Sequence, residues 1–254
     1  MNSMLIIFSA IFGLIIGSFL NCLAWRLYKD ESIMGRSYCP SCRHQLNWYD
    51  NIPLLSFILL QGKCRHCQKK ISWQYPIVEF VTALLFALSF ASISSSSDIA
   101  FLLARDWLLI SSLVLVFIYD LRWQLVPMLL VWPLIVMIII FNLLLGFPWQ
   151  ELVMFGVLGA LFFLIQYIAT KGRGLGEGDI WLGLLIGVSF PRFDLLALSL
   201  ILAYFVGAIV SVILLIGGKK ELKSKVALGP FLAFGAIITL IYGNSIINWY
   251  LGLI

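Results

Sequence analysis

The chain carries little charge. Asp, Glu, Lys and Arg make up 11% of its 254 residues, whereas 62% are hydrophobic and the mean hydropathy is +1.03. Because soluble domains contain about 25% charged residues, this composition argues against one and predicts a multi-pass membrane protein. Histidine is scarce too: His44 and His66 are the only two. Their isolation argues against a His-Glu-x-x-His zinc protease or a Ser-His triad.

A basic segment before the first apolar run is also missing. Residues 1–3 carry no Lys or Arg, while Arg26 and Lys29 follow the run. This order predicts a retained first helix with its N-terminus outside, rather than a cleaved signal peptide. The net charge of +5 then marks cytoplasmic loops, and no nucleic-acid partner is expected.

Long apolar runs dominate what is present. A bilayer-spanning helix needs about 20 such residues. Eight runs lie at 4–23, 76–96, 100–119, 124–146, 151–170, 180–193, 194–217 and 228–250, of which the sixth is too short to cross alone. With the N-terminus outside, fifteen of the 17 Lys and Arg residues fall in loops 24–75, 120–123, 171–179 and 218–227. This asymmetry predicts an all-α transmembrane bundle of about eight spans with these loops in the cytoplasm.

The soluble insert, residues 24–75, contains two Cys-x2-Cys knuckles. They are Cys39–Cys42 and Cys64–Cys67, separated by 21 residues. Four thiolates suit a closed, tetrahedral and therefore structural Zn²⁺ site, which would hold together an insert too small for its own core. Two disulfides or four free thiols are the alternative, which a reducing cytoplasm disfavours. The expected insert is therefore small, cytoplasmic and zinc-ribbon-like.

Two carboxylates adjoin apolar runs on the inner side. Asp120 ends the third run, and Asp179 closes Gly176-Glu-Gly-Asp179 before the sixth. Counted from Asp106 and Arg192 as outer markers, at 1.5 Å per residue, they lie about 20 and about 18 Å deep in a core of about 30 Å. At that depth they need a wet cavity, where one could act as acid and the other as base on a water. For Asp120, a loop ion pair with Arg122 is an equally weighted alternative, whereas Glu177 is expected to be a solvated loop residue.

Six motifs in order resemble the type 4 prepilin peptidases, the membrane GxGD aspartic proteases, along nearly the whole chain. They are Gly17-Ser-Phe-Leu-Asn21 with Arg26-Leu27, the paired knuckles around Asp50-Asn-Ile-Pro53, Tyr75-Pro76 with Glu79, Tyr119-Asp120, Gly176-Glu-Gly-Asp179 and Gly229-Pro-Phe-Leu-Ala233. There are departures from the family pattern. Met128 stands where an Asp is common, and Trp181 where a Lys is usual.

The resemblance implies that Asp120 and Asp179 are the catalytic pair of an aspartic endopeptidase in the bacterial plasma (inner) membrane. It would cut the basic leader from prepilin or pseudopilin precursors at the cytoplasmic face, typically after a glycine. Many family members then methylate the new N-terminus from S-adenosylmethionine, for which Gly62 and Lys63 are the candidate methyl-donor region. The expected divisions are a first helix at 1–23, the insert at 24–75 and a protease bundle at 76–254, surrounded by membrane lipid.

Two other classes of function stay open on the residues alone. A proton-coupled carrier could use Asp120 and Asp179 as a relay, although only one interrupted segment and no internal repeat are visible. A non-catalytic assembly protein would instead depend on the cysteine knuckles and tolerate loss of either Asp.

Overall fold

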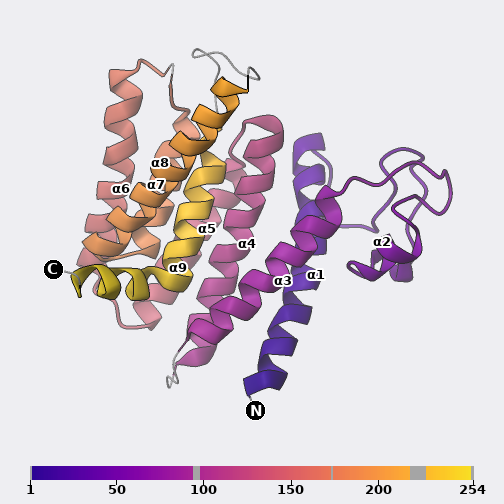
Figure 1. Ribbon diagram of the computed structural model, residues 1–254, viewed down its shortest axis with the longest axis horizontal. Coiled ribbons are helices and arrows are strands. Elements are labelled where there is room, and N and C mark those ends of the chain that lie inside the picture. Colours follow the sequence, from indigo (N-terminus) through magenta and orange to yellow (C-terminus); the bar gives the residue numbers. More distant parts are fainter. Residues whose placement is uncertain (1, 94–97, 173, 218–226, 253–254) are drawn as a thin grey trace. The chain divides into compact units, whose positions relative to one another are not determined.

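The computed structural model (Figure 1) describes the chain except for residues 1, 94–97, 173, 218–226 and 253–254. In the described part the regular structure is helical, with two isolated bridges and no strand. The chain divides into two compact units, Met1–Ser94 and Ser95–Ile254. Five of the basic loop residues lie outside the described residues: Arg173, Lys219, Lys220, Lys223 and Lys225.

The first unit is built on two long helices, α1 (Asn2–Lys29) and α3 (Gln74–Ser92), which pack along each other. Glycines allow the close approach. A Cβ added at Gly13 would lie 2.7 Å from the Cα of Ala83, and one at Gly17 would lie 2.8 Å from the Cα of Glu79. This spacing of small residues four apart is typical of membrane helix pairs.

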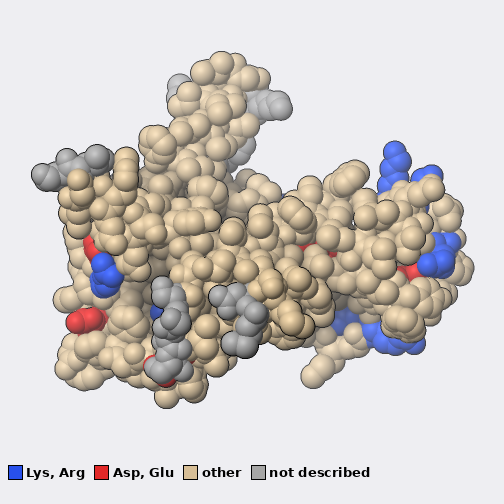
Figure 2. Space-filling view, turned by 60° about the horizontal axis from the view of Figure 1, so that its bottom comes forward, with Lys and Arg blue, Asp and Glu red and all other residues tan. Residues whose placement is uncertain are grey.

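The insert joins these two helices and contains a short 3-10 helix, η1 (Trp48–Asn51), and the helix α2 (Leu55–Leu59). In Figure 2, Lys and Arg gather over this insert. The buried side chain of Arg26, near the end of α1, donates to the carbonyls of Ile33, Gly35 and Arg36. These contacts tie the beginning of the insert to α1.

In its described residues the second unit contains six helices: α4 (Ile99–Trp123), α5 (Met128–Leu144), α6 (Trp149–Ala169), α7 (Glu177–Ser189), α8 (Phe193–Ile216) and α9 (Gly229–Leu251). The short helix α7 contacts α5, α6, α8 and α9. Its Leu182, Leu185 and Ile186 are at most 1% exposed. Close packing with α6 requires glycine, because a Cβ at Gly159 would lie 2.2 Å from the carbonyl oxygen of Gly183. Helix α7 is therefore an inner helix of this unit.

A buried polar network joins the end of α7 remote from Gly176 to α4 and α5. Arg105 pairs with Asp106 at 2.7 Å and donates to the Asn142 side chain at 3.2 Å. Asn142 is fully buried and donates to the carbonyl of Val188 at 2.7 Å. The network satisfies polar groups that would be costly to bury alone.

The expected helical membrane fold is confirmed. Each of the eight apolar runs corresponds to one helix, and among the described residues six helices are long and apolar enough to cross a membrane by length and composition. Their outer faces suit lipid: Ile168 is 65% exposed, Ile201 64% and Phe205 64%. One boundary differs, since α1 continues to Lys29 rather than ending at residue 23. Leu23 and Ala24 are buried, which accounts for the extra turns of helix.

Candidate active site and metal centre

Asp120 lies in the last turns of α4 and is only 6% exposed. Its Oδ2 accepts a hydrogen bond of 2.8 Å from the backbone N–H of Gly229, at the start of α9. A helix N-terminus presents unpaired N–H groups and a partial positive charge, both of which stabilise a carboxylate. Asp120 is thus held across the unit by a helix distant in sequence.

Asp179 lies in the first turn of α7 and is 8% exposed. Its Oδ2 accepts a hydrogen bond of 2.9 Å from the N–H of Gly176, the residue that precedes the helix. This contact is half of a capping box, which fixes both the helix start and the carboxylate. The Gly-x-Gly-Asp stretch therefore positions Asp179 through its own helix.

The structure brings the two carboxylates to the same end of the second unit. Helices α4 and α7 each contact α5 and α9, and a Cβ added at Gly178, next to Asp179, would lie 2.5 Å from the side chain of Val126 in the turn after α4. Each carboxylate uses its Oδ2 to accept a glycine amide from a helix start. Two carboxyl groups close enough to share a proton can act as an acid and a base on one water.

The structure also shows the two charged residues nearest in sequence to the carboxylates, Arg122 and Glu177. Arg122 lies over the ring of Trp123 and is absent from the ion pairs of the described residues. The loop ion pair between Asp120 and Arg122 therefore does not form in this structure. Glu177 is exposed and accepts a hydrogen bond from the hydroxyl of Tyr167 at 3.1 Å, as expected for a solvated carboxylate.

Gly229 begins one of the six family motifs, but no role in the site was predicted for it. A Cβ at this position would lie 2.5 Å from the Oδ2 of Asp120, so only glycine lets the carboxylate reach the amide. The available signal was Gly229-Pro230 before an apolar run, because Pro favours the first turn of a helix. The Gly229-Pro230 pattern predicts where the helix starts, but it does not predict that Asp120 faces this start.

We expect Gly229→Ala to lower the peptidase activity that the resemblance implies by about 10²-fold, because the new methyl group would displace the Asp120 carboxylate by about an ångström. Cleavage should be measured on purified protein of equal helical content. Gly174→Ala is the control, since its Cβ would meet Thr170 only at 3.5 Å. Wild-type cleavage by Gly229→Ala would show that the amide contact is dispensable.

The four knuckle cysteines form one cluster. Their Sγ atoms all lie within 4.8 Å of one another, and those of Cys39 and Cys67 are 3.9 Å apart. Four sulfurs around Zn²⁺ at about 2.3 Å would be about 3.8 Å apart. All five cysteines of the chain are free thiols, so the disulfide alternative is not observed. The donor set and its spacing fit a structural zinc ion.

The two knuckles have nearly the same backbone. The backbone N–H of Cys39 donates a hydrogen bond to the carbonyl of His44, and the backbone N–H of Cys64 donates one to the carbonyl of Lys69, both at 2.9 Å. The residue after each second cysteine has a positive φ, 56° for Arg43 and 58° for Gln68. The first cysteine of each knuckle is buried and the second exposed. Burial raises the pKa of the Cys39 thiol, but hydrogen bonds from the backbone of Cys42 and Ser41 outweigh it and lower the pKa to about 7, which favours the thiolate that binds metal.

The methyl-donor candidates take part in the local structure of the insert. Gly62 has a φ of +67°, and a Cβ there would lie 3.1 Å from the ring of Phe57. Lys63 forms an isolated bridge with Lys70. Nearby, buried Glu79 accepts the N–H of Leu54 at 2.8 Å and so anchors the insert to α3. Turn geometry thus explains Gly62, and a methyl-donor role for Gly62 and Lys63 stays a prediction.

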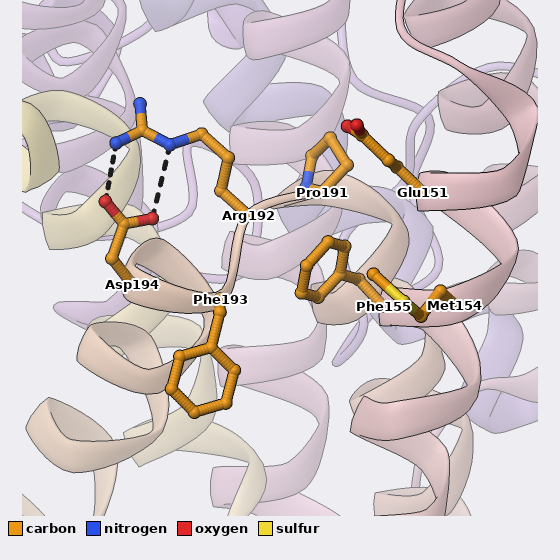
Figure 3. Close-up of a pocket in the computed structure, with 7 residues that line it drawn as sticks. All are labelled: Glu151, Met154, Phe155, Pro191, Arg192, Phe193 and Asp194. Carbon is orange, nitrogen blue, oxygen red and sulfur yellow. Dashed lines mark hydrogen bonds and ion pairs between the residues drawn. The ribbon is translucent and has the colours of Figure 1, made fainter.

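A cavity of about 470 Å³ lies at the other end of the second unit, around the turn between α7 and α8 (Figure 3). Arg192, at its edge, points toward Asp194 and pairs with it at 2.5 Å. Glu151 comes from the start of α6 on the opposite side. Neither Asp120 nor Asp179 lines this cavity, so it is not part of the carboxylate site.

Comparison with known proteins gives matches in both units. Residues 11–93 match the bacterial peptidase A24 N-terminal domain, and residues 107–212 match the type IV leader peptidase family. Proteins named prepilin leader peptidase/N-methyltransferase are similar over nearly their whole length. The Aeromonas salmonicida protein is 34% identical over 96% of this chain and 93% of its own. The Pseudomonas aeruginosa protein is 32% identical over 94% and 91%, and the Bacillus subtilis protein is 31% identical over 95% and 96%.

No solved structure matches the chain significantly. The first family match falls within the first unit and the second match within the second. Asp120 and Asp179 both lie in the part that matches the peptidase family. Gly229, whose amide binds Asp120, lies beyond the end of that part. With relatives above 30% identity along almost the full chain, this protein is a membrane enzyme that belongs to the type IV leader peptidase family.

Proposed function

We propose that this chain is a membrane-embedded aspartic endopeptidase that removes the basic leader from type IV prepilin or pseudopilin precursors. The observation that carries the proposal is the pair of buried carboxylates, Asp120 and Asp179, each held by a glycine amide at the same end of the second unit. The names of the relatives support the substrate class.

In the proposed reaction, one carboxylate accepts a proton from a water molecule while the oxygen of that water attacks the carbonyl carbon of the scissile bond. The other, protonated carboxyl group donates its proton to the carbonyl oxygen. Collapse of the tetrahedral gem-diol breaks the C–N bond, the leaving amine takes up the proton accepted from water, and one hydroxyl proton of the gem-diol returns to the other carboxylate as the carboxylic acid product forms. The glycine amides keep both side chains in place throughout, which reduces the reorganisation that the step requires.

We place the enzyme in the bacterial inner membrane, with the N-terminus outside and both the insert and the carboxylate pair on the cytoplasmic side. The distribution of Lys and Arg supports this orientation. The basic leader of a precursor would then be reached from the cytoplasm while its apolar part stays in lipid.

Two further groups belong to the proposal. Cys39, Cys42, Cys64 and Cys67 would hold a structural Zn²⁺, which closes the insert and takes no part in hydrolysis. The relatives are also named N-methyltransferases, which supports a second activity with S-adenosylmethionine as the methyl donor. Its donor site would lie in the insert, with Gly62 and Lys63 as candidates.

The decisive experiment incubates the purified full-length protein with a prepilin peptide, with and without S-adenosylmethionine, and measures product masses. We expect the free leader and the mature fragment in both reactions, and one added methyl group on the mature fragment only when the methyl donor is present. Cleavage without methylation would mean that the protein has the endopeptidase activity but not the methyltransferase activity. An intact precursor, together with proton flux in vesicles, would favour the carrier alternative.

A further inference from the structure

The cavity of about 470 Å³ around the turn between α7 and α8 has both charged and apolar walls (Figure 3). Its charged residues are Glu151, Arg192 and Asp194, and its apolar residues are Met154, Phe155, Pro191 and Phe193. Small-molecule sites are typically about 300–1,000 Å³ in volume. The cavity is therefore large enough for a small ligand that has both a polar and an apolar part.

Arg192 is held in place from two sides and still has donors to offer. Its Nε and Nη2 donate to the Asp194 carboxylate at 3.2 and 2.5 Å. Its Nη1 donates to the side-chain oxygen of Asn244, in α9, at 3.1 Å. A guanidinium carries five N–H groups, so these contacts leave two of them for an acidic group of a ligand.

Glu151 lies across the cavity from this ion pair, in the first turn of α6 (Figure 3). It is half-buried and is absent from the ion pairs of the described residues. Two carboxylates and one guanidinium thus line the cavity, with an excess of one negative charge. This excess attracts a cationic group to the side of Glu151.

The cavity lies where two membrane-spanning helices begin. Helices α6 and α8 are both long and apolar enough to cross a membrane, and they start at Trp149 and Phe193 beside the cavity. Trp149 is 62% exposed, and Trp is enriched at the boundary between lipid headgroups and acyl chains. Phe193 and Met154 are exposed too, at 71% and 49%. A ligand in this cavity is therefore at the level of the headgroups and beside an apolar surface.

We propose that this cavity binds a phospholipid whose headgroup carries a primary ammonium beside its phosphate, as in phosphatidylethanolamine. The ammonium donates to Glu151, the phosphate accepts from the remaining N–H groups of Arg192, and an acyl chain lies along Met154 and Phe193. An anionic headgroup without an ammonium would be repelled by the excess negative charge. A quaternary ammonium has no N–H to donate to Glu151. The site is separate from the carboxylate pair and does not depend on the proposed reaction.

The test measures lipid binding to the purified full-length protein in a nonionic detergent by native mass spectrometry. Phosphatidylethanolamine, phosphatidylglycerol and phosphatidylcholine with the same acyl chains are added in turn. We expect one molecule of phosphatidylethanolamine to bind with a Kd about 10-fold lower than that of either other lipid, because it alone forms a charge-assisted hydrogen bond to Glu151. Equal Kd values for the three lipids would overturn the proposal, and this comparison needs no variant.

Glu151→Gln removes the charge at nearly constant size. It should raise the Kd of phosphatidylethanolamine about 10-fold without raising that of phosphatidylglycerol. Glu177→Gln is the matched control, because Glu177 is an exposed carboxylate in the first turn of α7 and does not line the cavity. It should keep the wild-type preference.

Three results with the variants would contradict the site. A Glu151→Gln protein that still prefers phosphatidylethanolamine would exclude the ammonium contact. An equal loss of preference in Glu177→Gln would mean that net charge, and not this cavity, selects the lipid. A dimer that retains no lipid would show that a second copy of the chain covers the cavity instead.

Discussion

Asp179→Asn is expected to lower the rate of precursor cleavage by about 10²- to 10⁴-fold, the usual contribution of a general acid or base. The amide of Asn can still accept the Gly176 N–H that holds the side chain, so α7 should keep its start. What is lost is the ability to carry or accept a proton. Single-turnover cleavage of a prepilin peptide by protein of unchanged helical content measures the effect.

Asp120→Asn should have a similar effect, and the double variant should be little worse than either one, because residues that act as a unit are not additive. Glu177→Gln is the matched control, since that exposed carboxylate lies two residues from Asp179 and should be dispensable. Near-wild-type rates in Asp120→Asn or Asp179→Asn would exclude the aspartic mechanism.

Cys64→Ser is expected to abolish stoichiometric zinc binding and to open the insert to proteolysis. Structural zinc contributes about 10–16 kcal/mol of apparent binding free energy, which is folding free energy for a domain that small. The Sγ of buried Cys64 lies within 4.8 Å of the other three cysteine sulfurs, and a serine hydroxyl is a far weaker metal ligand. Metal analysis of the purified protein and limited proteolysis within 24–75 measure the two effects.

Cys22→Ser provides the comparison, because Cys22 lies in α1, outside the cluster, with its Sγ 4.0 Å from the Ser37 hydroxyl. It should retain one zinc per chain and a protected insert. Unchanged zinc content in Cys64→Ser would mean that the metal, if bound, uses other ligands.

Most of the helices could be predicted from the sequence, because a lipid bilayer allows few kinds of secondary structure to span it. Uninterrupted apolar runs can only be helices, and the two Cys-x2-Cys knuckles bring their own ligand spacing. Asp179 was recognisable because a carboxylate flanked by glycines stands out between apolar runs. In each of these cases the signal is local.

The features that could not be predicted from the sequence are contacts between residues far apart along the chain. Gly229 lies 109 residues from the carboxylate it binds, and a single sequence records no such pairing. Asp106 was used as a marker of the outer surface, but α4 begins at Ile99 and Asp106 is buried beside Arg105. The depth of about 20 Å calculated for Asp120 therefore started from a residue inside the helix. Burial of an ion pair depends on the neighbouring helices, which the sequence does not specify.

The shortness of α7 has a consequence for how the enzyme would respond to its membrane. Its 13 residues extend about 20 Å, less than the thickness of the hydrocarbon core. Because α5, α6, α8 and α9 contact it and its apolar side chains are buried, protein rather than lipid sets its height. A thicker or thinner bilayer would tilt or strain the outer helices, while the helices around α7 hold Asp179 at its level. The same enzyme could thus serve membranes of different lipid composition.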